Sequence, residues 1–299
     1  MAKIIVCAPN FSEGRDPAVV AACKEALLSV PGIVLNNQLT DADHNRSSFN
    51  YHGEPQAVAD ATLALAKKIV ELIDMNKHTG GHPRMGALDV VPLVPLKDVT
   101  EEEAIECSRQ IGRRLWEELG VPVFYYEDSA TRPERRNLSN VRKGQWEGMA
   151  EKLLLPDWAP DHGERRMHPT AGITAVGARF PMLAFNINLD TTDLALAKKI
   201  AKTIRQSGGG LDCVKAIGLR LEEKNMVQVS FDITDYRKAP MYRVLEFVKL
   251  EAARYNVRVV NSELVGSFPM QSIIDTALYY LHADTFDPQK QIFEFRLLD

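Results

Sequence analysis

The chain has 299 residues, of which 45% are hydrophobic and 25% charged, a composition typical of globular proteins. Its formal net charge of −4 argues against a nucleic-acid partner. It has no run approaching the roughly 20 apolar residues of a membrane span, and its N-terminus lacks a secretory signal. We therefore expect a cytoplasmic protein with no nucleic-acid or membrane partner. The four cysteines, Cys7, Cys23, Cys107 and Cys213, form no CxxC pair, which predicts reduced, mostly buried thiols.

The first part of the chain alternates apolar β-branched runs with helical patterns. Asp16-Pro17 and Glu54-Pro55 are residue pairs that favour the start of a helix. The pattern predicts a strand at 3–8, a helix at 17–28, strands at 32–36 and 47–52, a helix at 56–74 and a strand at 88–94. This β-α-β-β-α-β order is that of a ferredoxin-like split unit.

The same order of elements returns near the C-terminus. A predicted helix at 101–119 and strand at 121–126 come first, followed by an irregular tract at 128–170 that is rich in Arg, Pro, Gly and Trp. The pattern then predicts a strand at 184–189, a helix at 192–207, a hairpin of 214–222 and 226–233, a helix at 240–255 and a strand at 257–265. We therefore predict an α+β fold, an α/β sandwich of two ferredoxin-like subdomains at 1–180 and 181–299, with a ligand between them.

The stretch HTGGHPRMGALDVVP, from His78 to Pro92, is unusual for a core element because it combines glycines, prolines and histidines. The i, i+4 spacing of His78 and His82 suits zinc on a helix, but Gly80, Gly81 and Pro83 argue against a helix here, and the Glu of HExxH is missing. We expect His78 to be solvated in a turn. We expect His82 to transfer protons, because glycine, proline and the following Arg84 place it beside a charged side chain.

Three further groups of polar residues stand out. DADHNR, from Asp41 to Arg46, holds two carboxylates that could orient a histidine or hold a metal, although the residues alone favour a surface turn. PNFSEG, from Pro9 to Gly14, follows a predicted strand, where polar residues often face a ligand, although a turn and helix N-cap would also explain it. Clustered cations suggest carboxylate or phosphate recognition, or a solvated face: Arg132, Arg135, Arg136, Arg142, Lys143, Arg165 and Arg166.

Taken together, these segments resemble a known family, that of glutamate formimidoyltransferase, the formiminotransferase domain of formiminotransferase–cyclodeaminase. The resemblance rests on PNFSEG, DMNKHTGGHPRMGALDVVPLVP at 74–95, DWAPD at 157–161, AFNINL at 184–189 and VNSELVGSFP at 260–269. It implies transfer of the formimino group from N-formimino-L-glutamate to N5 of tetrahydrofolate in histidine degradation, with 5-formyltetrahydrofolate as another substrate. It also implies a folate groove between the two subdomains, a homodimer and no metal. Because the chain ends at residue 299, we expect no cyclodeaminase domain.

The resemblance also implies roles for particular residues. The second histidine of the motif, His82, corresponds to the catalytic residue, and an acidic residue before Asn-Arg corresponds to Asp41 or Asp43, either of which could orient His82. We expect Asn10, Arg46 and Arg84 to contact substrate. The folate-binding segment corresponds to Gly163, Glu164, Arg165, Arg166, Met167, His168, Pro169, Thr170, Ala171 and Gly172. By charge alone, its two arginines could pair with the glutamate tail of folate.

Two other functions fit some of the same residues. A metal-dependent hydrolase would use His78, His82 and Asp41 or Asp43 as ligands. A reduced-folate binding protein without turnover would use the folate segment alone and would tolerate the loss of His82.

Overall fold

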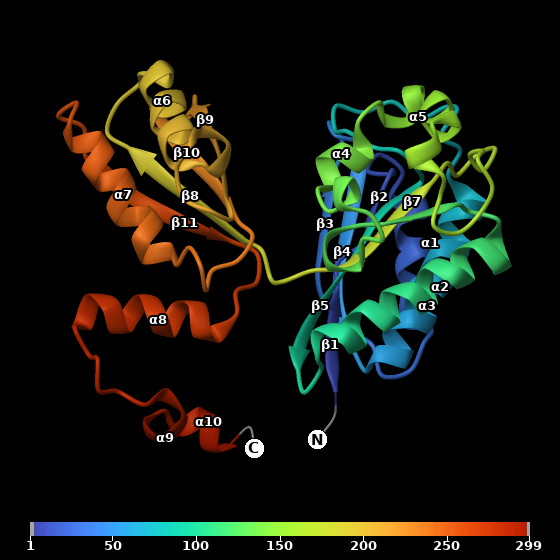
Figure 1. Cartoon of the computed structure of the whole chain (residues 1–299), viewed down its shortest axis with the longest axis horizontal. Helices are drawn as coiled ribbons and strands as arrows, with labels where there is room; N and C mark the ends of the chain where they lie inside the picture. The colour runs from blue at the N-terminus through green and yellow to red at the C-terminus, as the bar shows by residue number, and fades with distance from the viewer. Residues whose placement is uncertain (1–2, 298–299) are drawn as a thin grey trace. The chain divides into compact units, whose positions relative to one another are not determined.

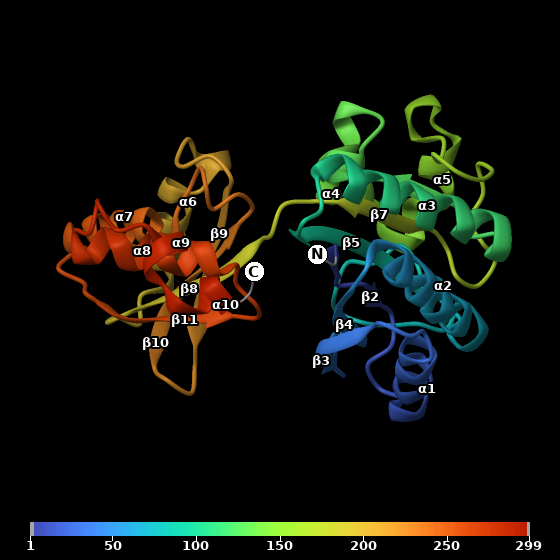
Figure 2. The ribbon, with the colours of Figure 1, turned by 90° about the horizontal axis from the view of Figure 1, so that it is seen from below.

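The computed structural model describes residues 3–297, which form two compact units that divide between Arg179 and Phe180 (Figures 1 and 2). Each unit has its own sheet and its own hydrophobic core. No helix within this range is long and apolar enough to cross a membrane. The cysteines are free, and all but Cys213 are fully buried.

The first unit is built on a seven-stranded sheet. Its strands are β1 (Ile4–Cys7), β2 (Asn10–Phe11), β3 (Val34–Asp41), β4 (Arg46–Gly53), β5 (Leu88–Lys97), β6 (Val123–Tyr125) and β7 (Thr174–Ala178). β1 and β2 follow one path, since both pair antiparallel with β4 and β5, and β3 pairs with the far side of β4. This is the predicted ferredoxin-like arrangement. β7 and β6 extend it in parallel beyond β5.

Helices cover both faces of this sheet (Figure 1). The long helices are α1 (Pro17–Leu28), α2 (Pro55–Leu72) and α3 (Glu101–Leu119), and the short ones are α4 (Leu138–Arg142) and α5 (Gln145–Leu154). Neighbouring strand residues point to opposite faces. Val91 therefore packs in the core beneath the long helices, whereas Val90 joins Val141 of α4 and Met149 of α5 in a second cluster.

The helix ends follow from local sequence. Asp16 accepts hydrogen bonds from two amides of the first turn of α1, and Thr100 and Glu103 form a capping box at the start of α3. Lys152 of α5 donates to three carbonyl groups at the end of α4, those of Asn140, Val141 and Lys143. Burial lowers the pKa of Lys152 to about 8. This lysine therefore joins the two short helices.

The second unit has a four-stranded antiparallel sheet in the order β11-β8-β10-β9, again ferredoxin-like. Its elements are β8 (Leu183–Leu189), α6 (Leu194–Ile204), β9 (Val214–Leu221), β10 (Met226–Ile233), α7 (Met241–Ala253) and β11 (Val259–Val265). The helices α8 (Met270–Leu281), α9 (Pro288–Gln291) and α10 (Phe293–Leu297) follow. The predicted α+β class and both β-α-β-β-α-β orders are confirmed. The sequence patterns did not reveal β7 or the last three helices.

Candidate active site

Asn45 connects three polar segments of the sequence, DADHNR, PNFSEG and HTGGHP, through hydrogen bonds. Its Oδ1 accepts the amide of Gly14 at 2.9 Å, its Nδ2 donates to the carbonyl of Thr79 at 3.0 Å, and its own carbonyl accepts Nε2 of His78 at 2.9 Å. Asn45 is buried and has a left-handed φ of 48°, which Asn tolerates better than most residues. The turn between β3 and β4 is thereby tied to the PNFSEG and HTGGHP segments.

His78 has a structural role. It is half-buried, and its Nδ1 accepts a long hydrogen bond of 3.4 Å from Nε of Arg84 while its Nε2 donates to Asn45. The expectation that His78 is merely solvated is therefore wrong. Gly80, two residues on, is required by the same packing, because a Cβ there would lie 2.2 Å from the carbonyl oxygen of His44.

His82 is a neutral imidazole with a defined tautomer. Its Nδ1 donates to the carbonyl of Pro83 at 2.7 Å, so its Nε2 carries the lone pair and accepts Nη1 of Arg46 at 2.8 Å. Burial and the neighbouring Arg46 guanidinium lower the pKa of His82 below its ordinary value. The side chain therefore presents a base, not an acid, at neutral pH.

Neither candidate carboxylate orients His82, since both ring nitrogens already have other partners. Asp41 instead pairs with His44, with 2.9 Å between its Oδ2 and Nδ1 of the ring. Asp43 is exposed in the same turn. This corrects the expectation for Asp41 and Asp43: the turn from Ala42 to Asn45 is followed by Arg46, so an arginine and no carboxylate reaches the imidazole.

Arg46 takes the place that the sequence suggested for Arg84. Arg46 begins β4, and burial lowers its pKa to about 10. Arg84 turns away and makes a bidentate ion pair with Glu147 of α5, at 2.7 and 3.1 Å. The expected substrate contact by Arg84 is therefore not supported by its position, because its guanidinium is occupied inside the fold.

A buried carboxylate, Asp89, lies behind this group. It accepts the amide of Met85 at 2.9 Å and pairs with Arg142 of α4. The charge of Asp89 raises the pKa of Arg46, which burial lowers. It also raises the pKa of His82, which Arg46 and Arg142 lower. Asp89 thus compensates part of the positive charge gathered around the imidazole.

Two cavities meet at His82. One, of about 380 Å³, is lined by Asn10, Leu39, Thr40, Asp41, His44, Arg46, Ser47, Ser48 and His82. The other, of about 430 Å³, is lined by His82, Pro83, Ser139, Arg142, Lys143, Gly144 and Gln145. Of the expected substrate contacts, Asn10 and Arg46 therefore share a cavity with His82. A base between two polar cavities can move a proton between groups bound on either side.

The predicted folate segment, Gly163 to Gly172, lies outside the lining of both cavities. His168 and Gly172 exchange backbone hydrogen bonds of 2.9 and 3.1 Å, and the amide of Ala87 donates to the carbonyl of Ala171. The segment therefore packs against the stretch from His78 to Pro92, at Ala87. Arg165 and Arg166 are exposed, and Arg166 pairs with Glu164.

Arg135 shows that the arginine-rich tract is partly structural. It is 1% exposed and donates to Asp161 at 2.7 Å and to the carbonyls of Asp157 and Ala159. Its guanidinium also lies 4.9 Å from the ring centre of Phe124. Neither a solvated face nor anion recognition describes this residue. No sequence signal separates it from its exposed neighbours.

The ligand set of a metal-dependent hydrolase does not assemble. The ring of His78 is engaged by Asn45 and Arg84, and Asp41 by His44. Within residues 3–297 no group of three or more His, Cys, Asp or Glu side chains is placed to hold a metal ion.

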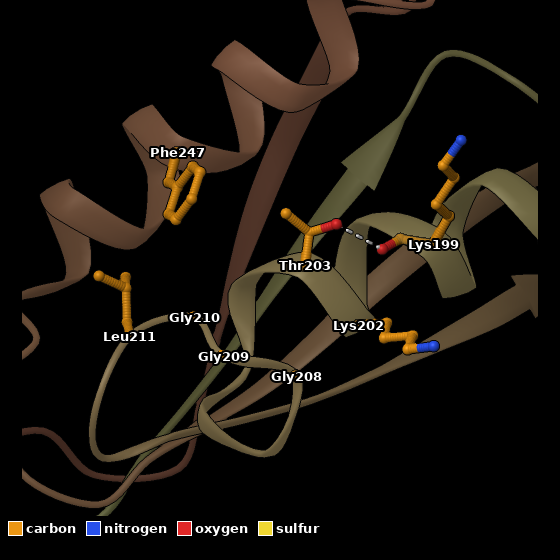
Figure 3. A pocket seen from close by; sticks show the side chains of 8 residues that line it. All are labelled: Lys199, Lys202, Thr203, Gly208, Gly209, Gly210, Leu211 and Phe247. Atoms are coloured by element: carbon orange, nitrogen blue, oxygen red, sulfur yellow. Dashed lines mark hydrogen bonds between the residues drawn. The ribbon is translucent and has the colours of Figure 1, made fainter.

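A larger cavity of about 660 Å³ lies in the second unit, beside the Gly208-Gly209-Gly210 loop (Figure 3). The amides of all three glycines donate to backbone carbonyls within 2.9–3.1 Å, two of them to Arg205. Lys199 and Lys202 extend away from Phe247 in Figure 3 and are exposed. The loop has no free amides with which to bind an anion.

Known protein families match both units of the chain. A family described as the formiminotransferase domain, N-terminal subdomain, matches residues 4–179, and one described as the formiminotransferase domain matches residues 184–294. A two-unit α+β fold with a neutral histidine between polar cavities suits a group-transfer enzyme, and the chain is a transferase. It belongs to the formiminotransferase family.

Named relatives match all or nearly all of the chain. The glutamate formimidoyltransferase of Streptococcus pyogenes serotype M1 is 53% identical over 298 residues, which is 100% of both chains. That of Thermoplasma acidophilum is 43% identical over 95% of this chain and 94% of its own. The formimidoyltransferase-cyclodeaminase of Rattus norvegicus is 40% identical over 94% of this chain but only 53% of its own length. The family resemblance seen in the sequence is confirmed.

Proposed function

We propose that this chain is a glutamate formimidoyltransferase, which moves the formimino group of N-formimino-L-glutamate to N5 of tetrahydrofolate and releases L-glutamate. Family membership supports the reaction. The structural observation that carries it is His82, whose Nε2 holds a lone pair at the junction of two polar cavities.

The chemistry needs a base of this kind. N5 attacks the amidine carbon of the donor, a C–N bond forms, and N5 must lose its proton to Nε2 of His82. Because burial lowers the pKa of His82, the protonated ring readily gives up its proton again. The nitrogen of the departing glutamate takes up a proton as its C–N bond breaks. No covalent intermediate on the protein is required.

Arg46 must move before His82 can act, because Nη1 of Arg46 donates a hydrogen bond to the lone pair on Nε2. A carboxylate of the donor competes for that guanidinium, since an arginine–carboxylate pair is stronger than its bond to a neutral ring. Binding of the donor therefore releases the base. Nε of Arg46 is buried and has no hydrogen-bond partner among the residues described.

The folate would be held by the segment from Gly163 to Gly172, with exposed Arg165 and Arg166 pairing with its glutamate tail. The same contacts would admit 5-formyltetrahydrofolate. Exposed Lys143, in the second cavity at His82, offers positive charge to a carboxylate of the donor. The expected homodimer stays a prediction, which light scattering of the purified protein would test.

The test is to incubate the protein with tetrahydrofolate and formiminoglutamate and to follow L-glutamate. Release that depends on the folate and survives chelator treatment supports the transferase. Release that is lost with bound zinc would favour the hydrolase. Folate binding without release would favour the reduced-folate binding protein.

A further inference from the structure

A second histidine, His44, lies next to His82. The centres of the two rings are 6.1 Å apart with 70° between their planes, and both side chains line the cavity of about 380 Å³. His44 comes from the turn between β3 and β4, two residues before Arg46. The two imidazoles are therefore brought together from segments 38 positions apart in the sequence (82 minus 44).

Asp41 holds the ring of His44. Its Oδ2 lies 2.9 Å from Nδ1 of the ring, and its Oδ1 accepts the backbone amide of His44 at 2.8 Å. The carboxylate therefore receives the Nδ1 proton, and Nε2 is left as the reactive nitrogen. Among the residues that the structure describes, nothing hydrogen bonds to this Nε2.

The turn that carries His44 is fastened at several points. Nε of Arg15 donates to the carbonyl of Ala42 at 2.9 Å, and Asn45 bonds to Gly14 and Thr79. Gly80 also packs closely against the carbonyl of His44 in this turn. A turn that only connects two strands does not need hydrogen bonds to Gly14 and Arg15 before α1 and to Thr79.

The two histidines have charges of opposite sign beside them. Arg46 contacts His82, whereas Asp41 contacts His44. Two histidines in one cavity, one beside a cation and the other beside a carboxylate, are a usual arrangement of a base and an acid. We propose that His44, held by Asp41, is the acid that protonates the leaving nitrogen of the donor, while His82 is the base that takes the proton of N5. This rests on the proposed function.

The step balances. N5 bonds to the amidine carbon and its proton goes to Nε2 of His82. The bond from that carbon to the glutamate nitrogen breaks, and its electron pair takes the proton on Nε2 of His44. His44 is left neutral, still donating Nδ1–H to Asp41, and His82 is left protonated. Both recover by exchange with water: the side chains of His44 and Asp41 are each 53% exposed, and His82 is partly exposed.

The test compares two donors with different leaving groups. The glutamate nitrogen must be protonated to depart, whereas the phenoxide of phenyl formimidate, the anion of a phenol with a pKa of about 10, departs without a proton. His44→Gln should lower kcat with formiminoglutamate by about 10²-fold and leave the enzyme-catalysed rate with phenyl formimidate close to wild type. His82→Ala should lower both, since each donor needs N5 to lose its proton.

Two further variants complete the test. His52→Gln is the matched control, because His52 lies on β4, bonds to Asn36 and does not line the cavity. It should leave both donors unaffected. Asp41→Asn should show the donor dependence of His44→Gln in a weaker form. Equal losses on both donors would show that His44 only supports the structure, and unchanged rates would remove it from the reaction; either result overturns the inference while the proposed function stands. A wild-type protein that releases no glutamate would overturn both.

Discussion

Nη1 of Arg46 lies 2.8 Å from Nε2 of His82, and the opposite nitrogen of the ring donates to the carbonyl of Pro83. A cation on one side and a carbonyl on the other specify a neutral ring with one tautomer. The relationship joins the first residue of β4 to the loop between α2 and β5. The contact leaves a neutral base in the cavity, and its lone pair stays hydrogen bonded until another group binds the guanidinium of Arg46.

Replacing Arg46 by Met should change the pH dependence of the reaction. His82 acts as the neutral ring, so kcat/KM rises with pH through its pKa. The pKa of His82 is lowered by burial and by Arg46, and without the guanidinium it should rise. The acidic limb of the profile should therefore move to higher pH. Arg109→Met, on the exposed side of α3, is the control; an unmoved limb in Arg46→Met would contradict this assignment.

Replacing Asn45 by Ala should destabilise the first unit. The variant leaves the Gly14 amide and the Thr79 carbonyl without partners, at a cost of about 2 kcal/mol or more in the free energy of unfolding. Asn225 has a similar φ of 47° but is exposed in the turn between β9 and β10, so Asn225→Ala serves as the control for backbone strain alone. Denaturant unfolding measures both, and equal losses would argue against the role of the Asn45 side chain.

Adjacent glycines of the histidine motif should respond differently to a methyl group. Gly80→Ala places a Cβ 2.2 Å from the carbonyl of His44, whereas Gly81→Ala meets nothing within 4 Å. We expect Gly80→Ala to lower both the melting temperature and kcat, with a stability cost of about 1–3 kcal/mol, because the turn must shift. Gly81→Ala should resemble wild type. Similar melting temperatures and kcat values for the two variants would mean that the turn carrying His44 can shift at little cost in free energy.

Replacing buried Arg135 and exposed Arg166, both in the tract at 128–170, should change the free energy of unfolding by different amounts. Arg135→Met leaves Asp161 buried without its cation and should cost about 3–5 kcal/mol. Arg166→Met removes an exposed pair with Glu164 and should cost less than about 1 kcal/mol, while it weakens binding of tetrahydrofolate if the proposed tail contact holds. Thermal melts and folate titrations of both variants make the comparison. Unchanged folate binding in Arg166→Met would remove that arginine from the folate site.

Regular elements were predictable because burial sets their periodicity. β10 runs over Met226–Ile233 and α3 over Glu101–Leu119, as the patterns predicted, and most other ends differ by a few residues. β3 is the main exception: it continues to Asp41, since its exposed polar residues carry no apolar pattern but pair with β4. β7 was missed because its five residues, Thr174–Ala178, are small and follow an irregular tract.

The site was only partly predictable, for a reason of distance along the chain. Local sequence singled out His82, since glycine and proline exclude a regular element there. It favoured Arg84 as the neighbouring charge because Arg84 is close in sequence. The true neighbour, Arg46, is brought in by strand pairing, and Arg84 is drawn to Glu147, 63 positions away. Partners of this kind follow from the tertiary fold and not from spacing.

The measurement that tests the central claim most directly is the rate of glutamate release by His82→Ala, with tetrahydrofolate binding measured on the same sample. Loss of the base should lower kcat by about 10²-fold or more while folate still binds, because no residue of the proposed folate segment hydrogen bonds to the His82 ring or lines its two cavities. Release at the wild-type rate would contradict the account and remove His82 from the chemistry.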